Sequence, residues 1–468
     1  MKTIVGILLL MVSVFAYPQQ RCNRPLASDH TWQNVGQAGF TAGQGYYTSL
    51  AFSPVDGQPY VAFVDIPQGP GNTGPGTVMK FDGTQWVNVG VAGFTGVTIG
   101  YTSLAFSLVD HLPYVAFAAG CSSTLQASVM KFDGTNWIYV GNGGFSPGTA
   151  AYTSLAFNPV NGQPYVAFMD LMNSGKVSVM KFEENNWVYV GVPDFSPGEA
   201  WFTRIAFSPA GTLYAVYQEM ATTLDVTVMK FNGSSWEAVG SAGFTSGHAD
   251  EIGFGVSPID GQPYVAVDDA ANFHQIKVMT FDGSNWVTVG DMGSTQGWAT
   301  RMCLAFSQSG QLYVSYWDSS FPGICVKTFN GTNWINVGNT GFSAAYIDYP
   351  SFLLSASGIP YQAYMDEADS NRVTVKKYDF PTGFGEQSER GIFLYPDPVT
   401  KFLTLKFTNR DNFPKNIEIY DIGGNKMMAA QTSENKFIVN TGDYAAGMYI
   451  IKAKTEKSVY VSKFLKKN

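Results

Sequence analysis

Short apolar runs separated by polar turns repeat along the first 380 residues of the chain. In one repeat the runs are residues 152–157, 165–169, 177–182 and 187–190, and the turns between them are rich in Asn, Gly and Pro. Aromatic and β-branched residues bounded by such turns predict four short β-strands. Apolar residues fall on both faces of each strand, as expected for a sheet packed between two neighbouring sheets.

The fourth strand of each repeat begins with the motif Trp-x-x-Val-Gly. The motif occurs seven times, and its tryptophans are Trp32, Trp86, Trp137, Trp187, Trp236, Trp286 and Trp334. A period of about 50 residues built from short strands is typical of a β-propeller.

Counting strands predicts how the propeller closes. The last set of three strands has no tryptophan strand after it, and the Trp32 strand has no set before it. Pairing the two would remove two exposed sheet edges. We therefore expect an all-β protein with a seven-bladed β-propeller closed by the N-terminal strand.

The repeated tryptophans could be sugar-stacking residues, but identical placement in every repeat favours packing between blades. The Asp-Gly and Asn-Gly turns before them, such as Asp82-Gly83, are typical of hairpins. These turns resemble the Asp boxes of sialidases, except that Trp follows Asp by four residues instead of five. The repeats therefore indicate no particular enzyme family.

The N-terminal residues 1–16 have the pattern of a signal peptide, with Lys2 followed by an apolar stretch and a small-residue cleavage site. No later segment approaches about 20 apolar residues, so we expect no transmembrane segment in the mature protein. Cys303 and Cys325 lie two strand spacings apart in one predicted blade, too far for a disulfide. The sequence neither excludes nor supports a disulfide between Cys22 and Cys121.

Charge is distributed unevenly along the chain. Residues 17–390 contain 15 basic and 29 acidic residues, whereas residues 391–468 contain 12 basic and 7 acidic ones. An acidic main body argues against nucleic acid as a partner, because nucleic-acid binding requires cations that neutralise phosphates. It is compatible with neutral sugars, cations or basic partners.

The last 75 residues carry five ordered motifs of a different kind. They lie at residues 394–399, 403–407, 417–426, 447–451 and 463–466. Together they resemble the type A C-terminal sorting domain of cargo of the type IX secretion system of Bacteroidota, with Tyr-Pro-Asp-Pro at 395–398 where that family has Tyr-Pro-Asn-Pro.

The resemblance implies a small β-sandwich at 393–468, reached by a linker at 381–392 after a propeller at 17–380. It also implies an interaction with the type IX secretion machinery and passage across the outer membrane of a Gram-negative bacterium. The protein would then be extracellular or attached to the outer cell surface.

The loops after the second and fourth strands of each blade vary most, and both sets emerge on the same face of a propeller. We expect this variable face to be functional, because binding residues concentrate on loops held by a rigid scaffold. Six of the seven second strands end in an acid: Asp65, Asp170, Glu219, Asp269, Asp318 and Asp366. These acids could bind the amides of their own turns or form an acidic collar for a cation or a hydroxyl-rich ligand.

Blades 4 to 6 depart most from the consensus. The residue that opens the first strand is Tyr47, Tyr101, Tyr152, Phe202 or Tyr349 in the other blades, whereas blades 5 and 6 have Glu251 and Arg301. The three tryptophans outside the motif lie in the same sector. Clustered departures predict a ligand site, although ion pairs and packing peculiar to these repeats are an alternative. The predicted ligand-binding residues are Trp201, Arg204, His248, Asp250, Glu251, Asp268, Asp269, His274, Trp298, Arg301 and Trp317.

Catalytic signatures are sparse. The sequence has neither Gly-x-Ser-x-Gly nor His-Glu-x-x-His, and the Gly-x-Gly-x-x-Gly match at 69–74 precedes a strand and does not open a helix. We assign no catalytic residue and expect no cofactor and no metal site. The leading interpretation is a secreted recognition propeller that binds a glycan or another extracellular ligand. The alternatives are a polysaccharide hydrolase or lyase that uses the acids and histidines of blades 4–6, and a protein-interaction scaffold.

Overall fold

The computed structural model describes residues 31–66, 74–120, 125–220, 224–245, 252–269, 273–292, 297–321, 323–378, 392–395, 399–407, 416–421, 424–454 and 459–467. The regular elements in these ranges are β-strands, apart from the 3₁₀ turns η1 (Leu171–Asn173) and η3 (Glu367–Asp369). No helix among these residues is long and apolar enough to cross a membrane. The predicted all-β fold is confirmed.

Residues 32–378 form seven four-stranded antiparallel sheets, here numbered in chain order by their first strands. Sheet 1 contains β2 (Gln44–Phe52), β3 (Pro59–Ile66), β4 (Gly76–Phe81) and β5 (Trp86–Asn88). Sheet 2 contains β6 (Ile99–Phe106), β7 (Pro113–Ala119), β8 (Gln126–Phe132) and β9 (Trp137–Tyr139). Sheet 3 contains β10 (Ala150–Phe157), β11 (Pro164–Asp170), β12 (Lys176–Glu183) and β13 (Asn186–Tyr189).

The remaining sheets repeat this order. Sheet 4 contains β14 (Ala200–Phe207), β15 (Leu213–Glu219), β16 (Asp225–Phe231) and β17 (Trp236–Ala238). Sheet 5 contains β18 (Gly253–Val256), β19 (Pro263–Asp269), β20 (Gln275–Phe281) and β21 (Trp286–Thr288). Sheet 6 contains β22 (Ala299–Phe306), β23 (Leu312–Asp318), β24 (Gly323–Phe329) and β25 (Trp334–Asn336). Sheet 7 contains β26 (Ile347–Leu354), β27 (Pro360–Asp366), β28 (Arg372–Tyr378) and β1 (Trp32–Asn34).

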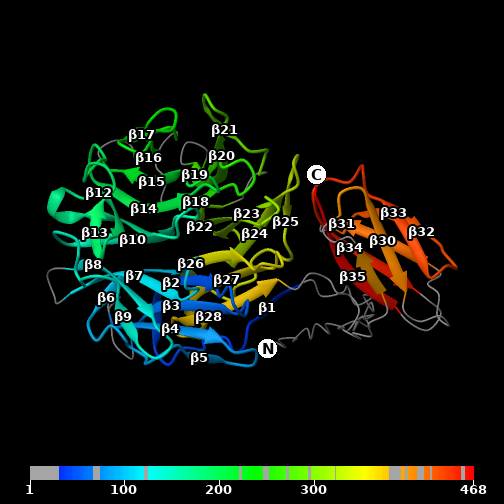
Figure 1. Ribbon diagram of the computed structural model, residues 1–468, viewed down its shortest axis with the longest axis horizontal. Coiled ribbons are helices and arrows are strands. Elements are labelled where there is room, and N and C mark those ends of the chain that lie inside the picture. Colours follow the sequence, from blue (N-terminus) through cyan, green and yellow to red (C-terminus); the bar gives the residue numbers. More distant parts are fainter. Residues whose placement is uncertain are drawn as a thin grey trace, which may run out of the picture.

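The fourth strand of sheet 7 comes from the other end of the chain. β1 pairs antiparallel with β28, so that Trp32 lies opposite Tyr378 and Asn34 opposite Lys376. The first strands of successive sheets contact one another from β2 to β26, and β26 in turn contacts β2. Figure 1 shows these first strands near the centre of the blade-like sheets and the fourth strands toward the rim.

The motif tryptophans join each sheet to the one before it. Their indole N–H groups donate to the carbonyl of the motif valine one sheet earlier, at N···O distances of 2.7–3.0 Å. Trp32 donates to Val337 and so repeats the contact between sheets 6 and 7. The interpretation of these tryptophans as packing residues is confirmed.

A second aromatic residue covers six of the seven indoles. A phenylalanine after the motif glycine stacks on the tryptophan with ring centroids 4.0–4.4 Å apart and planes within 19° of parallel. The motif glycine itself has a positive φ, 73° at Gly36, and a Cβ there would lie 3.0 Å from Phe81 and 3.2 Å from Trp86. Only glycine fits this conformation and space.

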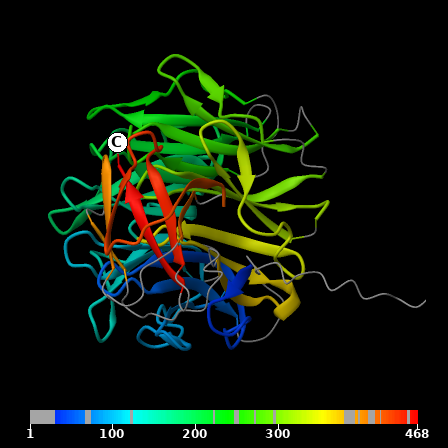
Figure 2. The ribbon, with the colours of Figure 1, turned by 90° about the vertical axis from the view of Figure 1, so that its right-hand side faces the viewer.

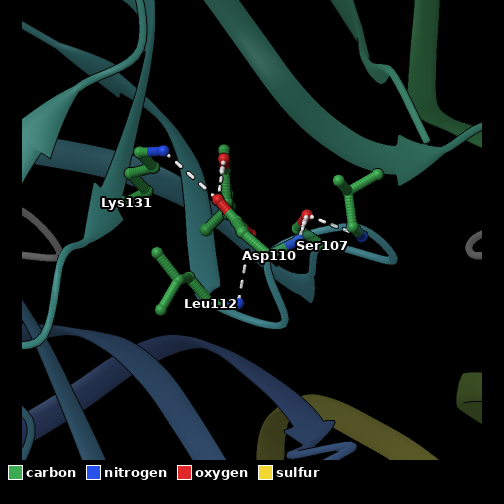
Figure 3. A network of polar contacts seen from close by, with 6 residues as sticks. Ser107, Asp110, Leu112 and Lys131 are labelled. Carbon is green, nitrogen blue, oxygen red and sulfur yellow. Dashed lines mark hydrogen bonds and ion pairs between the residues drawn. The ribbon is translucent and has the colours of Figure 1, made fainter.

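The turns between first and second strands are held by their own side chains. In sheet 2, Ser107 Oγ accepts the N–H groups of Val109 and Asp110, at 3.2 Å each. Asp110 accepts from Leu112 N, Tyr114 Oη and Lys131 Nζ, at 3.0–3.2 Å (Figure 3). Burial raises the pKa of the Asp110 carboxyl, but these hydrogen bonds outweigh it and the net pKa is lowered.

The C-terminal residues form two further sheets, shown in orange to red in Figure 2. One contains β29 (Ile392–Tyr395), β30 (Phe402–Phe407) and β33 (Lys436–Asn440). The other contains β32 (Lys426–Ala430), β31 (Asn416–Asp421), β34 (Gly447–Lys454) and β35 (Val459–Lys466). They share a separate core that includes Leu403, Ile419 and Phe464.

Cysteine placement fits the expectation from strand spacing. Cys303 on β22 and Cys325 on β24 are both buried thiols. Cys22 and Cys121 lie outside the described residues.

Replacing Trp32 with alanine tests whether β1 joins sheet 7 to sheet 6. Trp32 is 5% exposed, donates to Val337 and stacks on Phe342. Losing a buried tryptophan should cost about 3–5 kcal/mol, which would lower the Tm by roughly 5–10 °C. Differential scanning calorimetry measures this shift. Trp201→Ala, which removes a partly exposed indole outside the motif, is the control, and an equal Tm for both variants would contradict a joining role for β1.

Candidate functional site

A β-bulge occurs at the same place in the six first strands whose corresponding residues are described; Glu251, at this place in sheet 5, lies outside the described residues. The register shifts after Tyr46, Gly100, Ala151, Trp201, Thr300 and Asp348. The residue that follows has a φ between 47° and 58° at Tyr47, Tyr101, Tyr152, Phe202, Arg301 and Tyr349. Such left-handed conformations are uncommon for bulky residues. A bulge of this kind redirects a side chain from the regular alternation of the strand.

Hydrogen bonds between sheets support the bulges. Thr48 Oγ1 donates to Tyr349 O, Thr102 Oγ1 to Tyr47 O, and Thr153 Oγ1 to Tyr101 O. The following serine accepts a backbone N–H of the next sheet, as Ser49 does from Leu104 at 2.8 Å. The repeated Tyr-Thr-Ser sequence is thus a contact between sheets, and these contacts offset the cost of the strained backbone.

The redirected side chains line a central cavity of about 400 Å³. Tyr47, Tyr101, Tyr152 and Phe202 form a chain of aromatic contacts with ring centroids 4.9–5.3 Å apart, and Tyr349 contacts Tyr47 at 4.4 Å. Burial, together with its tyrosine neighbours, raises the pKa of the Tyr47 phenol far above its ordinary value. The phenol is therefore neutral and can donate a hydrogen bond.

Charged groups occupy the other part of the cavity wall. Arg204, Arg301 and Asp348 all line it. Arg301 Nε lies 2.8 Å from Asp348 Oδ1, and Arg301 Nη2 donates to Tyr346 Oη at 2.7 Å. Burial raises the pKa of the Asp348 carboxyl, although Arg301 acts in the opposite direction.

A second cluster surrounds Trp298, just before β22. The Trp298 side chain is 59% exposed, and its ring centroid lies 4.7 Å from that of His274. Its backbone N–H donates to Ser319 Oγ at 2.8 Å, and its carbonyl accepts from Ser319 N at 3.0 Å. An exposed indole is therefore held by an ordered backbone.

The His274 ring is held in place by a buried carboxylate. Its Nδ1 lies 2.8 Å from Oδ2 of Asp268, whose residue is 2% exposed. His274 has a φ of 56° and receives the Ala299 N–H on its carbonyl at 3.1 Å. A carboxylate on Nδ1 fixes the orientation of the imidazole ring, so this histidine has a defined direction on the surface.

Three other predicted residues have partners of their own. Trp317 contacts Tyr346 edge to face, with centroids 5.3 Å apart. Trp201 Nε1 donates to Glu199 Oε1 at 2.8 Å. Asp269 Oδ2 lies 3.6 Å from Lys277 Nζ.

The structure thus places Arg204 and Arg301 at the cavity, gathers Asp268, His274 and Trp298 in a cluster beside it, and connects Trp317 to Arg301 through Tyr346. His248, Asp250 and Glu251 lie outside the described residues. Tyr346 and Asp348 were not among the predicted residues because they belong to sheet 7. Their only signal in the sequence is that they lie three residues and one residue before the repeated tyrosine position at Tyr349.

Three of the acids that end the second strands bind the amides of their own turns. Asp170 accepts from Met172 N, Asp318 from Ser320 N and Asp366 from Ala368 N, at 2.9–3.1 Å. Asp65 instead accepts from Thr77 Oγ1 on β4 at 3.1 Å. These contacts favour the turn-stabilising alternative for those acids. In the described part of the chain, no three His, Cys, Asp or Glu residues are grouped so that they could hold a metal ion.

Comparison with known families identifies the C-terminal part of the chain. Residues 393–467 match the family described as the secretion system C-terminal sorting domain. A search of curated proteins gave no match.

Several solved structures are similar over most of the chain. A protein of unknown function from Dyadobacter fermentans is 12% identical, covers 74% of this chain and 98% of its own, and has a TM-score of 0.47. A polysaccharide lyase PL25 ulvan lyase bound to -[GlcA(1-4)Rha3S]- is 14% identical, with 72% and 95% covered and a TM-score of 0.44. The SapL1 lectin in complex with alpha methyl fucoside is 17% identical, with 66% and 99% covered and a TM-score of 0.40.

A double-mutant cycle measures the Arg301–Asp348 pair. Its side chains are only 25% and 22% exposed, so solvent screens this ion pair less than it screens a pair on the open surface. We expect Arg301→Ala and Asp348→Ala to be coupled by about 1–3 kcal/mol in the free energy of unfolding, measured by urea denaturation.

The Lys131–Asp110 pair of Figure 3 is the matched control, with side chains 30% and 32% exposed. Its coupling should be about 0–1 kcal/mol, as for surface ion pairs. Additive effects of the Arg301 and Asp348 substitutions would contradict a structural pair at the cavity wall.

Proposed function

We propose that the seven sheets are the blades of one seven-bladed β-propeller that β1 closes. The proposal is supported by the β1–β28 pairing and by the Trp32 hydrogen bond to Val337. Leu50 N of sheet 1 also donates to Ser351 Oγ of sheet 7, at 2.9 Å. The same serine contact joins other neighbouring sheets, such as that from Leu104 N to Ser49 Oγ. We further propose the division into signal peptide 1–16, propeller 17–380, linker 381–392 and sorting domain 393–468.

The sorting domain gives the protein its destination. The match at 393–467 implies secretion through the type IX machinery, with the protein at the cell surface or outside the cell. The propeller is then the cargo, and we propose that a member of the Bacteroidota is its host. We assign the ligand-binding function to the propeller.

Truncation tests the role of the tail. A variant that ends before Gly391 should still contain a folded propeller but should accumulate in the periplasm, because the signal for crossing the outer membrane is gone. Immunoblotting of periplasmic, membrane and medium fractions from a type IX-competent host measures this. The full-length protein is the positive control, and truncated protein in the medium at the full-length level would contradict the assignment.

We propose that the propeller is a non-catalytic recognition module that binds a glycan. The observation that carries this proposal is Trp298, an indole exposed over 59% of its surface and held in place by Ser319 and His274. Exposed indoles with fixed orientation provide an apolar face for a sugar ring. Beside it, the second ring nitrogen of His274 offers a hydrogen bond to a hydroxyl group.

A second candidate function is a polysaccharide hydrolase or lyase. It is favoured by the His274–Asp268 pair, because a histidine oriented by a buried carboxylate is a suitable general base. A glycan array and a product assay on the same polysaccharides separate the candidates. Binding without new chain ends or unsaturated products supports recognition, turnover supports the enzyme, and neither result supports a protein-interaction scaffold.

Trp298→Ala tests the recognition site directly. If sugar rings stack on the indole, the variant should lose roughly 1–3 kcal/mol of affinity for a glycan identified on the array, the range measured for stacking on aromatic side chains. Isothermal titration calorimetry gives the Kd. Tyr139→Ala removes an aromatic side chain that is 45% exposed on β9, away from the site, and should leave the Kd unchanged. Equal affinity of Trp298→Ala and the wild type would overturn this site.

A further inference from the structure

We propose that the central cavity is a subsite for an acidic saccharide, in which Arg204 binds the carboxylate or sulfate group of the sugar. This inference rests on the proposed glycan recognition and specifies the class of glycan. It concerns a different part of the molecule from the exposed face of Trp298.

The walls of the cavity suit a saccharide. Tyr47, Tyr101, Tyr152 and Tyr349 supply aromatic rings and phenol groups to one volume of about 400 Å³. The threonines and serines that follow these tyrosines line the same volume. A sugar offers apolar C–H faces and hydroxyl groups, and pockets for small molecules combine apolar walls with a few directed polar groups in this manner.

The charges at the cavity favour an anion. Arg301 is neutralised by Asp348 at 2.8 Å. Arg204 has no ion-pair partner among the described residues, and its side chain is exposed at the cavity wall. Among the described charged residues of the wall, Arg204 is thus the cation that can meet an anionic group of a ligand. An arginine in this setting can bind a carboxylate or sulfate through two parallel N–H groups.

Arg204 occupies a position at which four other sheets have a serine that binds the next sheet. In the bulge register Arg204 corresponds to Ser49, Ser103, Ser154 and Ser351. Each of these serines accepts a backbone N–H of the next sheet at 2.8–3.1 Å. A guanidinium group has no acceptor, so the chain gives up this bond at sheet 4 and gains a cation at the cavity.

The cavity and Trp298 can be reached by one ligand. The bulges lie at the third residue of β6, β10, β14, β22 and β26, close to the end of each strand that adjoins the variable loops. Trp298 precedes Arg301 by three residues on the same strand segment, which corresponds to roughly 10 Å of extended chain. An oligosaccharide stacked on Trp298 could therefore place an acidic residue in the cavity.

Arg204→Ser tests the subsite. The substitution introduces the serine found at this register in four other sheets, so it should preserve the fold. The probes are two matched pairs: hexagalacturonate with its methyl ester, and a κ-carrageenan hexasaccharide with its desulfated form. The first pair tests a carboxylate and the second a sulfate. Isothermal titration calorimetry at 50 and 200 mM NaCl measures the Kd for wild type, Arg204→Ser and Lys230→Ser.

We expect at least one acidic probe to bind the wild type, to lose tenfold or more in affinity when it is neutralised, and to weaken with salt. Arg204→Ser should show the same tenfold loss. Lys230→Ser, which removes an exposed positive charge from β16 of the same sheet, should bind as the wild type does.

Other outcomes overturn the inference in distinguishable ways. Equal binding of acidic and neutral probes, or acidic binding that Arg204→Ser leaves intact, would mean that the cavity is a solvent-filled channel. If Trp298→Ala then still reduced binding, glycan recognition would stand without the subsite. Binding of neither acidic probe would also reject the subsite, and the neutral glycans of the array would then decide the proposed function alone.

Discussion

Neighbouring sheets are joined by one repeated contact, the hydrogen bond from a tryptophan N–H to the valine carbonyl of the preceding sheet. Seven such bonds connect the described sheets. The contact needs the indole, because the rings of phenylalanine and tyrosine have no N–H to donate, and it needs the motif glycine, because a Cβ would meet the indole and its neighbouring phenylalanine. One short motif therefore fixes both the spacing between sheets and the chain path after each fourth strand.

The central cavity depends on this spacing. Each bulge places a bulky residue in the left-handed region, at a cost of order 1–3 kcal/mol. At three of the six described bulges this cost is offset because the next sheet lies close enough for its threonine to bind the carbonyl of the bulge, as Thr102 does with Tyr47. The peripheral tryptophan contacts hold the sheets at that distance. Packing at the rim and geometry at the centre are thus coupled.

Much of the fold could be predicted from the sequence, because the repeat carries its own register. The Trp-x-x-Val-Gly motif marks every fourth strand, and the unmatched Trp32 predicts the partner of β28 that the structure shows. The bulges could not be predicted in this way. A strand pattern with period two does not reveal a tyrosine with φ near 50°. The sequence therefore predicts that the first strand of sheet 3 begins at Tyr152, whereas in the structure it begins two residues earlier, at Ala150.

The candidate site was predicted in part, and for a physical reason. Departures from a repeat mark positions that do more than maintain it, so Trp298 and Arg301 can be singled out from the sequence. They do not show which consensus residues take part. Tyr47 and Tyr101 looked like structural repeats, yet their rings form the cavity wall. Asp348 lies next to a consensus tyrosine, and only the sheet geometry shows that it pairs with Arg301.

The two kinds of sheet have complementary roles in this arrangement. Sheets 1 to 3 keep the full set of hydrogen bonds between first strands, and they hold the aromatic wall in place. In sheets 5 and 6 buried Ile252 and Met302 replace the threonine, so apolar packing substitutes for a hydrogen bond that constrains the neighbouring backbone. Arg301 occupies the bulge position in sheet 6. The conserved half of the repeat therefore supplies rigidity, and the diverged half supplies charge, to one shared cavity.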